Sequence, residues 1–225
     1  MKKAAKYIIL ALAACLLTGC GQEEETVILP PVTEQTLQLE EIGLRAENLS
    51  PYEGIYIEQG EEDEKVRVEN ACAMEFTNIG EKTIRDAHLV FTDGEEDYNF
   101  YFEMLPYGST VTVVEYDKQA APKAELHWAN STVNYLEEGV ENTDCIEVIG
   151  ELGVITVENK TFKDLPRLEI YYRRGDGNGG SVGGPCYKVT LDGLERRDTA
   201  SPEAICWSKN SVVVNVLLYP EVSAE

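Results

Sequence analysis

The sequence predicts an all-β protein with two tandem antiparallel β-sandwich modules behind an amino-terminal leader and a flexible tether. First, short runs of alternating apolar and polar residues follow residue 50, which is the period of half-buried strands. Second, turn residues such as Asn78-Ile79-Gly80 and Asp93-Gly94 separate these runs. Third, similar blocks recur in the same order in both halves of the chain. We expect residues 1–19 as leader, 20–45 as tether, 46–138 as the first module and 139–225 as the second.

The first six residues of the leader include three lysines, and an apolar run follows over residues 7–17. This run is too short to span a bilayer as a mature helix. It ends in Leu17-Thr18-Gly19-Cys20. An aliphatic residue, two small residues and a cysteine resemble the lipobox of bacterial lipoproteins. An ordinary secretory signal with an incidental cysteine is the alternative.

The lipobox resemblance implies that the sulfur of Cys20 receives a diacylglyceryl group and that cleavage makes Cys20 the first residue of the mature chain. Since two acyl chains anchor a protein stably, the expected location is the outer side of a bacterial membrane, with the lipid on Cys20 as the membrane partner. Residue Gly21 is not the aspartate associated with inner-membrane retention, so either membrane of a double-membraned cell stays open.

Residues 20–45 are expected to form an acidic tether. Gln22-Glu23-Glu24-Glu25 is charged, and Pro30-Pro31 disfavours helix and sheet. An edge strand over residues 26–29 is the alternative.

The first module is predicted from its strand periodicity. Val66, Val68, Cys72, Met74 and Phe76 share one face of a strand, and Ala87, Leu89 and Phe91 share one face of the next. Further strands are expected over residues 98–104, 110–116 and 124–135.

An internal repeat relates the two modules. Residues 98–105 align with residues 187–194 without a gap. Upstream, Asn78 aligns with Asn159 and Leu89 with Leu168. Downstream, the Trp128 segment aligns with the Trp207 segment. Each module is then about ninety residues, the size of an immunoglobulin-like sandwich.

The asparagine-turn-aliphatic block, the tyrosine- and phenylalanine-containing strand and the Pro106-Tyr107-Gly108 turn resemble the FxLYD-like domains of bacterial surface lipoproteins. The defining Leu-Tyr-Asp triplet is absent, and Leu89-Val90-Phe91 and Ile170-Tyr171-Tyr172 lie nearby. The resemblance implies a fold and no activity.

Four cysteines remain after the leader and Cys20 are set aside, and no Cys-x-x-Cys pair occurs among them. A zinc knuckle or thioredoxin-like site is therefore not expected. Cys72 shares the predicted core face and should be a buried thiol. Cys186 and Cys206 fall opposite core-facing residues, so we predict that both face outward and form a disulfide, although four cysteines allow three pairings.

The repeat places Cys186 over Asp97 and Cys206 over His127. We therefore hypothesise that Asp97 and His127 are spatial neighbours joined by a charge-assisted hydrogen bond, in the position that the disulfide takes in the second module. Two unrelated surface residues are the alternative.

No catalytic residue, metal site or cofactor is assigned. The two histidines, His88 and His127, fall on outward faces, and no Gly-x-Ser-x-Gly elbow occurs. A hydrolase that uses a carboxylate pair stays as an alternative because 41 acidic residues are present. Arg174-Gly175-Asp176 resembles an integrin-binding tripeptide on a glycine-rich loop, which makes an adhesin the second alternative.

The net charge of -22 repels phosphate backbones, so no nucleic-acid partner is expected. We expect a monomeric, non-catalytic surface lipoprotein that binds or displays, with an unidentified protein or envelope component as its partner.

Overall fold

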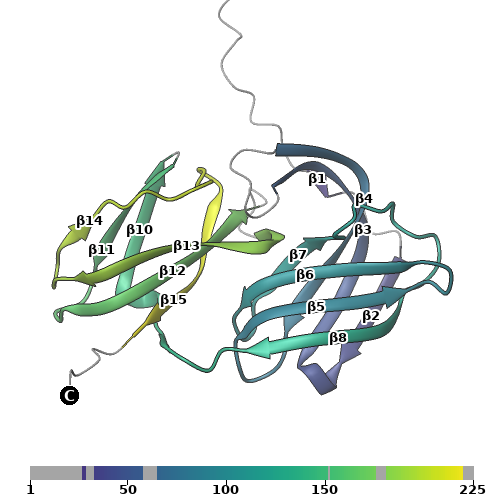
Figure 1. Cartoon of the computed structure of the whole chain (residues 1–225), viewed down its shortest axis with the longest axis horizontal. Helices are drawn as coiled ribbons and strands as arrows, with labels where there is room; N and C mark the ends of the chain where they lie inside the picture. The colour runs from purple at the N-terminus through teal and green to yellow at the C-terminus, as the bar shows by residue number, and fades with distance from the viewer. Residues whose placement is uncertain (1–26, 29–32, 58–64, 152, 176–180, 220–225) are drawn as a thin grey trace, which may run out of the picture.

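The computed structural model of the chain describes residues 27–28, 33–57, 65–151, 153–175 and 181–219. These residues form an all-β fold with two sandwich modules side by side, as Figure 1 shows. The predicted fold class is confirmed. Among the described residues, no helix is both long and apolar enough to cross a membrane.

Module 1 packs two three-stranded units face to face around an aromatic core. The first unit has the order β3-β4-β7 and the second the order β6-β5-β8. Their bounds are β3 Leu44–Ile57, β4 Lys65–Asn78, β5 Ile84–Thr92, β6 Asp97–Leu105, β7 Thr110–Val114 and β8 His127–Tyr135.

Module 2 repeats this arrangement with the orders β10-β11-β14 and β13-β12-β15. Its strands are β10 Ile146–Glu151, β11 Val154–Asn159, β12 Leu165–Gly175, β13 Ser181–Leu194, β14 Thr199–Ala200 and β15 Ser211–Leu218. The strands β3 to β8 and β10 to β15 follow one another in the same spatial order. The internal repeat in the sequence is therefore a repeat of the fold.

A buried asparagine explains why the asparagine block recurs. Asn78 and Asn159, each at most 1% exposed, end the equivalent strands β4 and β11. The amide of Asn78 donates to the carbonyls of Lys82 and Leu105. The amide of Asn159 donates to the equivalent carbonyls of Lys163 and Leu194 and also to that of Glu195. The asparagine thus joins its own turn to the end of the facing sheet in both modules.

The strand register corrects two parts of the predicted alignment. Leu89 pairs with Phe100 and Ile170 with Val189, so the counterpart of Leu89 is Ile170 and not Leu168. Phe91 pairs with Trp128 and Tyr172 with Val213, so Trp128 corresponds to Val213 and not to Trp207. The second alignment was wrong because the connection into β15 differs in length from the connection into β8.

Each module has its own hydrophobic core. Phe76, Phe91, Phe100 and Phe102 lie at the centre of module 1, with Phe76 within about 6 Å of the other three rings. Cys72 is buried there, as predicted. Val68 is not part of this core. A bulge at Asn70, with φ 57°, shifts the register of β4, and Val68 packs instead in a separate cluster with Ala71 and Ala73.

The amino-terminal boundary of module 1 lies earlier than predicted. β2 (Thr33–Leu39) pairs with β3, and a 3₁₀ turn, η1 (Glu40–Ile42), joins them. Leu39 and Leu44 are buried, and the side chain of Gln35 forms two hydrogen bonds with the backbone of Leu126. Residues 33–45 thus belong to the sandwich. β1 (Val27–Ile28) also pairs with β3, as the edge-strand alternative expected, and residues 20–26 lie outside the described part.

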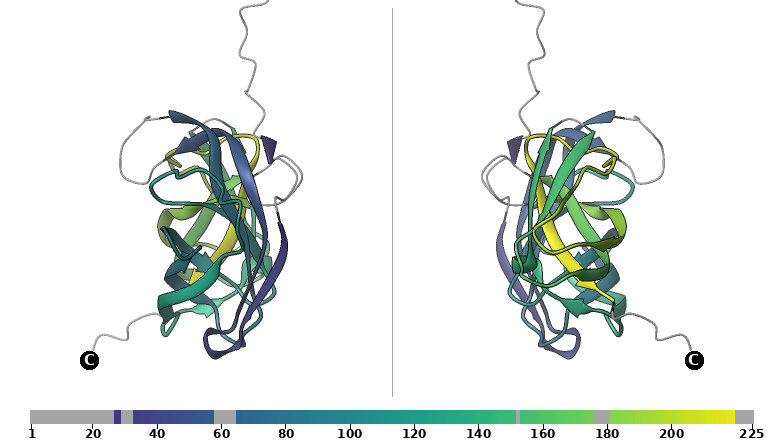
Figure 2. Two further views of the ribbon diagram at one scale, coloured as in Figure 1. Left: turned by 90° about the vertical axis from the view of Figure 1, so that its right-hand side faces the viewer. Right: turned by 90° about the vertical axis from the view of Figure 1, so that its left-hand side faces the viewer.

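A single sheet continues from one module into the other. β7 of module 1 pairs in parallel with β13 of module 2 at Thr112 and Val182. β9 (Val140–Glu141) extends the far end by pairing with β15, and the 3₁₀ turn η2 (Thr143–Cys145) follows it. Figure 2, which looks along the long axis, shows one module behind the other.

Candidate functional site

A buried polar contact between the modules lies where β12, β13 and β15 of module 2 meet β6 of module 1. We call this contact the junction; its central residues are Glu103, Met104, Arg173, Cys186 and Leu217. Gly184 forms its tightest point, because a Cβ atom there would overlap the carbonyl oxygen of Tyr101. The two backbones are in direct contact, which only glycine permits.

A buried arginine holds the junction. Arg173 is 1% exposed, and its Nη2 donates a hydrogen bond of 3.1 Å to the carbonyl of Met104. Burial lowers the pKa of Arg173, and the neighbouring Cys186 and Glu103 act in the opposite direction. The Glu103 carboxylate also accepts hydrogen bonds from the backbone N–H of Cys186 at 3.0 Å and from the Tyr101 hydroxyl at 2.6 Å. Removing one member of such a group leaves others buried without compensation.

The predicted Cys186–Cys206 disulfide is wrong, because both cysteines are free thiols. Cys186 does point out of the core of module 2, as its parity predicted, but module 1 covers it. It is 5% exposed and its Sγ contacts the carbonyl of Glu103 at 3.6 Å, while burial raises its pKa to about 11. Cys206 lies in the turn before β15 with φ 59°, partly exposed.

The predicted pair of Asp97 and His127 is also corrected. Both residues pair with Thr92, Asp97 from β6 and His127 from β8. Two strand spacings, about 9.6 Å, therefore separate the backbones of Asp97 and His127. This separation is too large for the direct hydrogen bond predicted between neighbouring positions. The predicted equivalence of His127 with Cys206 is wrong as well, because the register makes Val212, six residues after Cys206, the counterpart of His127.

The Arg174-Gly175-Asp176 tripeptide does not begin on a free loop. Arg174 and Gly175 are the last two residues of β12, where they pair with Val182 and Ser181 of β13, and Arg174 also pairs with Ser211 of β15. Asp176 lies outside the described residues. The returning strand packs on module 1 through Gly184.

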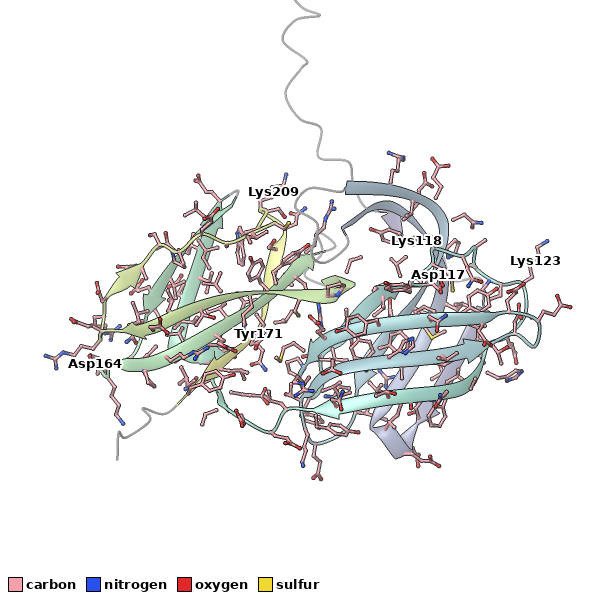
Figure 3. All side chains as sticks on the ribbon, in the orientation of Figure 1. Asp117, Lys118, Lys123, Asp164, Tyr171 and Lys209 are labelled. Carbon is pink, nitrogen blue, oxygen red and sulfur yellow. The ribbon has the colours of Figure 1, made fainter. Side chains whose placement is uncertain are left out.

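Sequence reasoning missed a buried carboxylate beside the junction. Glu169 on β12 has a side chain only 6% exposed and accepts hydrogen bonds from the hydroxyls of Tyr171 at 2.7 Å and Tyr219 at 3.0 Å. Arg167 and Lys188 add ion pairs at 3.1 and 3.2 Å. Tyr171, labelled in Figure 3, also packs against the junction. The alternation of β12 did not predict that Glu169 is buried, because Glu169 lies on the polar face of the strand.

The surroundings of Glu169 favour its ionised form. Burial alone would raise its pKa, but the hydrogen bonds from Tyr171, Lys188 and Tyr219 outweigh burial and the net shift is downward. The pKa of Tyr171 is raised by burial and then by the Glu169 carboxylate, so this hydroxyl stays protonated. The tyrosines and cations around Glu169 therefore stabilise its carboxylate form. The Glu169 carboxyl group carries no proton that it could donate near neutral pH.

An open depression with a cavity volume of about 590 Å³ lies near the connection between the modules. Glu81, Glu137 and Glu141 are among its lining residues, together with Lys82 and the exposed ring of Tyr107. Of these carboxylates, Glu141 accepts a hydrogen bond of 3.0 Å from the amide of Asn215. It is a wide acidic surface rather than a closed cleft.

Metal-binding groups do not gather in the described part of the chain, where no three histidine, cysteine or acidic residues form a metal-binding cluster. His88 and His127 are both exposed, as predicted. Cys20 lies outside the described residues. No family model matches the chain and no curated protein matches it, so the FxLYD-like resemblance still depends on the block residues alone.

Proposed function

We propose that this protein is a bacterial lipoprotein, anchored through Cys20 to the outer side of a membrane, whose two modules form one rigid body that binds a protein or envelope component. The observation that carries the proposal is Leu17-Thr18-Gly19-Cys20 at the end of a basic and then apolar leader. With β2 belonging to module 1, at most residues 20–32 separate the lipid from the sandwich, so the body stands close to the bilayer.

The junction supports a single rigid body rather than two modules on a hinge. A shared sheet, the backbone contact at Gly184 and the buried Arg173 resist relative movement of the modules. A rigid body presents its surfaces in a fixed geometry, which lowers the entropic cost of binding.

The two carboxyl groups with a shifted pKa do not suit the acid role that a hydrolase needs. A carboxylate-pair hydrolase needs one acid with a raised pKa to protonate the leaving group. Asp93 and Glu169 instead have lowered pKa values, Asp93 because it accepts backbone hydrogen bonds from Glu96 and Glu95. An adhesin working through residues 174–176 is disfavoured because Arg174 and Gly175 are paired strand residues.

Cell fractionation of two leader variants tests the anchor. Cys15 follows Leu12-Ala13-Ala14, so it is a matched control within the same leader. We expect Cys20→Ala to release the protein from membranes washed with salt and carbonate and to abolish incorporation of a labelled fatty acid. The Cys15→Ala variant should remain anchored and labelled. Membrane retention and labelling of Cys20→Ala would contradict the proposal, and loss of both only in Cys15→Ala would move the anchor to Cys15.

A further inference from the structure

The first strand of each module pairs with a different unit of its sandwich. In module 1, β2 precedes the 3₁₀ turn η1 and pairs with β3. In module 2, β9 precedes the 3₁₀ turn η2 at the equivalent place, but it pairs with β15 of the facing unit. Among the residues that the structure describes, no strand lies at the outer edge of β10, the counterpart of β3, where module 1 has β2.

The register fixes this equivalence residue by residue. Leu44 pairs with Asn78 and Ile146 pairs with Asn159, and these asparagines are counterparts. Positions 44–47 of β3 thus correspond to positions 146–149 of β10. In module 1, residues 36–39 of β2 pair with positions 44–47. Within the described part of the chain, β10 pairs with β11 alone and ends its sheet.

The side chains along this open edge have a defined chemical pattern. Every second residue of β10 is exposed and lies on its outer face, namely Glu147, Ile149 and Glu151. Ile149 is 64% exposed. Val154 on β11, 49% exposed, lies opposite Glu151 and extends the apolar spot. Lys160 pairs with Glu147 at 2.6 Å and with Glu158 at 3.6 Å, so this lysine contacts two carboxylates. With Glu151 added, the net charge of the face is negative.

We propose that the outer edge of β10 binds an extended segment of a partner protein as an added antiparallel strand, with a basic-x-apolar-x-basic pattern. Main-chain hydrogen bonds would supply affinity, and alternate side chains would supply selectivity. The apolar residue of the segment lies beside Ile149, and its basic residues lie beside Glu147 and Glu151. This inference deepens the binding role proposed above and rests on it.

Charge argues for a basic partner segment over a second copy of this chain. Two copies, each with a net charge of -22, repel one another, and an edge-to-edge pair would bring Glu147 and Glu151 against the same acidic face. A basic segment is attracted by that charge and gains cross-strand ion pairs, which also accelerate association.

Peptide binding to the full chain, purified in detergent from the cells that produce it, tests the inference. The probe is a fluorescent Thr-Lys-Thr-Val-Thr-Lys-Thr peptide, followed by anisotropy at 150 mM salt. We expect saturable binding, and a loss of at least tenfold in affinity when the peptide is N-methylated on the residues that donate to β10. N-methylation removes strand pairing and leaves the side chains unchanged, so equal binding of both peptides would overturn the inference.

Variants of exposed residues locate the binding edge. We expect Ile149→Lys and Glu151→Lys each to weaken peptide binding at least tenfold, because they place positive charge beside the basic residues. Tyr107→Lys changes an equally exposed apolar residue outside any strand edge and should alter affinity less than twofold. An equal effect of all three variants would mean that total charge decides, which contradicts an edge site.

Sedimentation of the same preparations identifies a competing occupant. A dimer that forms with increasing concentration and is lost in Ile149→Lys would overturn the partner segment in favour of a second copy. Membrane anchoring is measured separately on Cys20→Ala. Failure of peptide binding with an intact anchor therefore overturns this inference alone, and loss of the anchor with intact peptide binding overturns the location alone.

Discussion

Glu169 is a carboxylate that has lost most of its water and regained donors from the protein. Its side chain is 6% exposed, yet two tyrosine hydroxyls and two cationic side chains contact it. Charge-assisted hydrogen bonds are roughly twice as strong as neutral ones, which explains why the net pKa shift is downward despite burial. The ionised form of Glu169 therefore stabilises the folded state.

The pH dependence of stability follows from the sign of this shift. Because the folded pKa of Glu169 is lowered, its contribution is present above the ordinary glutamate pKa of about 4.3 and is lost as pH falls through the folded value. We expect Glu169→Gln to cost about 1–2 kcal/mol at pH 7 and to cost progressively less below about pH 4. Urea unfolding of both proteins from pH 7 to pH 3 measures this, and a constant difference would contradict it.

Thiol reactivity distinguishes the free cysteines from the disulfide that strand parity suggested. Burial raises the pKa of Cys186 to about 11, and Cys72 and Cys145 are also buried, whereas Cys206 is partly exposed. Under non-reducing conditions we expect one fast-reacting thiol, Cys206, in the native mature protein and four after unfolding. Two thiols after unfolding would mean that a disulfide forms.

Single residues were predictable where one module decides their surroundings. Cys72 follows the alternation of β4, and it is buried as expected. The environment of Cys186 could not be predicted, because its outward direction from module 2 leads into module 1. The surroundings of Glu169 could not be predicted either. Its hydrogen-bond donors come from β12, from β13 and from Tyr219 after β15, which are far apart in sequence.

At the scale of elements, the contact of β13 with β6 depends on a residue without a side chain. We expect Gly184→Val to destabilise the protein by about 3 kcal/mol, because the added atoms overlap the Tyr101 carbonyl and force the strands apart. Chemical denaturation with detection by tryptophan fluorescence measures the change.

The adjacent glycine provides a matched control for that substitution. Gly183 has φ 97°, but a Cβ atom there would meet nothing within 4 Å. Gly183→Ala should therefore cost only the backbone strain, about 1 kcal/mol. Equal costs at both positions would show that close approach of the strands is not the reason for Gly184.

Alternation predicted the existence of most strands better than their partners. Residues 98–104 were expected as a strand, and β6 spans Asp97–Leu105. β2 was missed because TEQTLQL is polar and follows two prolines, and its burial depends on pairing with β3. The alignment of Trp207 with Trp128 failed because Trp207 enters its core from a turn, where its ring lies against Gly150.

At the scale of the whole molecule, the shared sheet and the junction should make unfolding cooperative. We expect a single calorimetric transition with equal calorimetric and van't Hoff enthalpies for the native protein. Arg173→Ala leaves Glu103 without its buried counter-charge and should lower stability by about 3 kcal/mol and separate the transition into two. Two transitions in the unaltered protein would mean that the modules are independent.

The joining of the modules was beyond sequence reasoning. The repeat predicted two copies of one fold, but the single pairing of Thr112 with Val182 and the packing of Gly184 involve residues whose local patterns are ordinary. The acidity of the chain, by contrast, followed directly from composition and bears on the exterior as a whole.

The most direct test of the account is the mass of the amino-terminal tryptic peptide of the protein isolated from bacterial membranes. No lysine or arginine occurs between Cys20 and Arg45, so this peptide should span residues 20–45 and carry a diacylglyceryl group on Cys20. An unmodified Cys20, or a mature chain that begins at any other residue, would contradict the proposed anchor and with it the location of the protein.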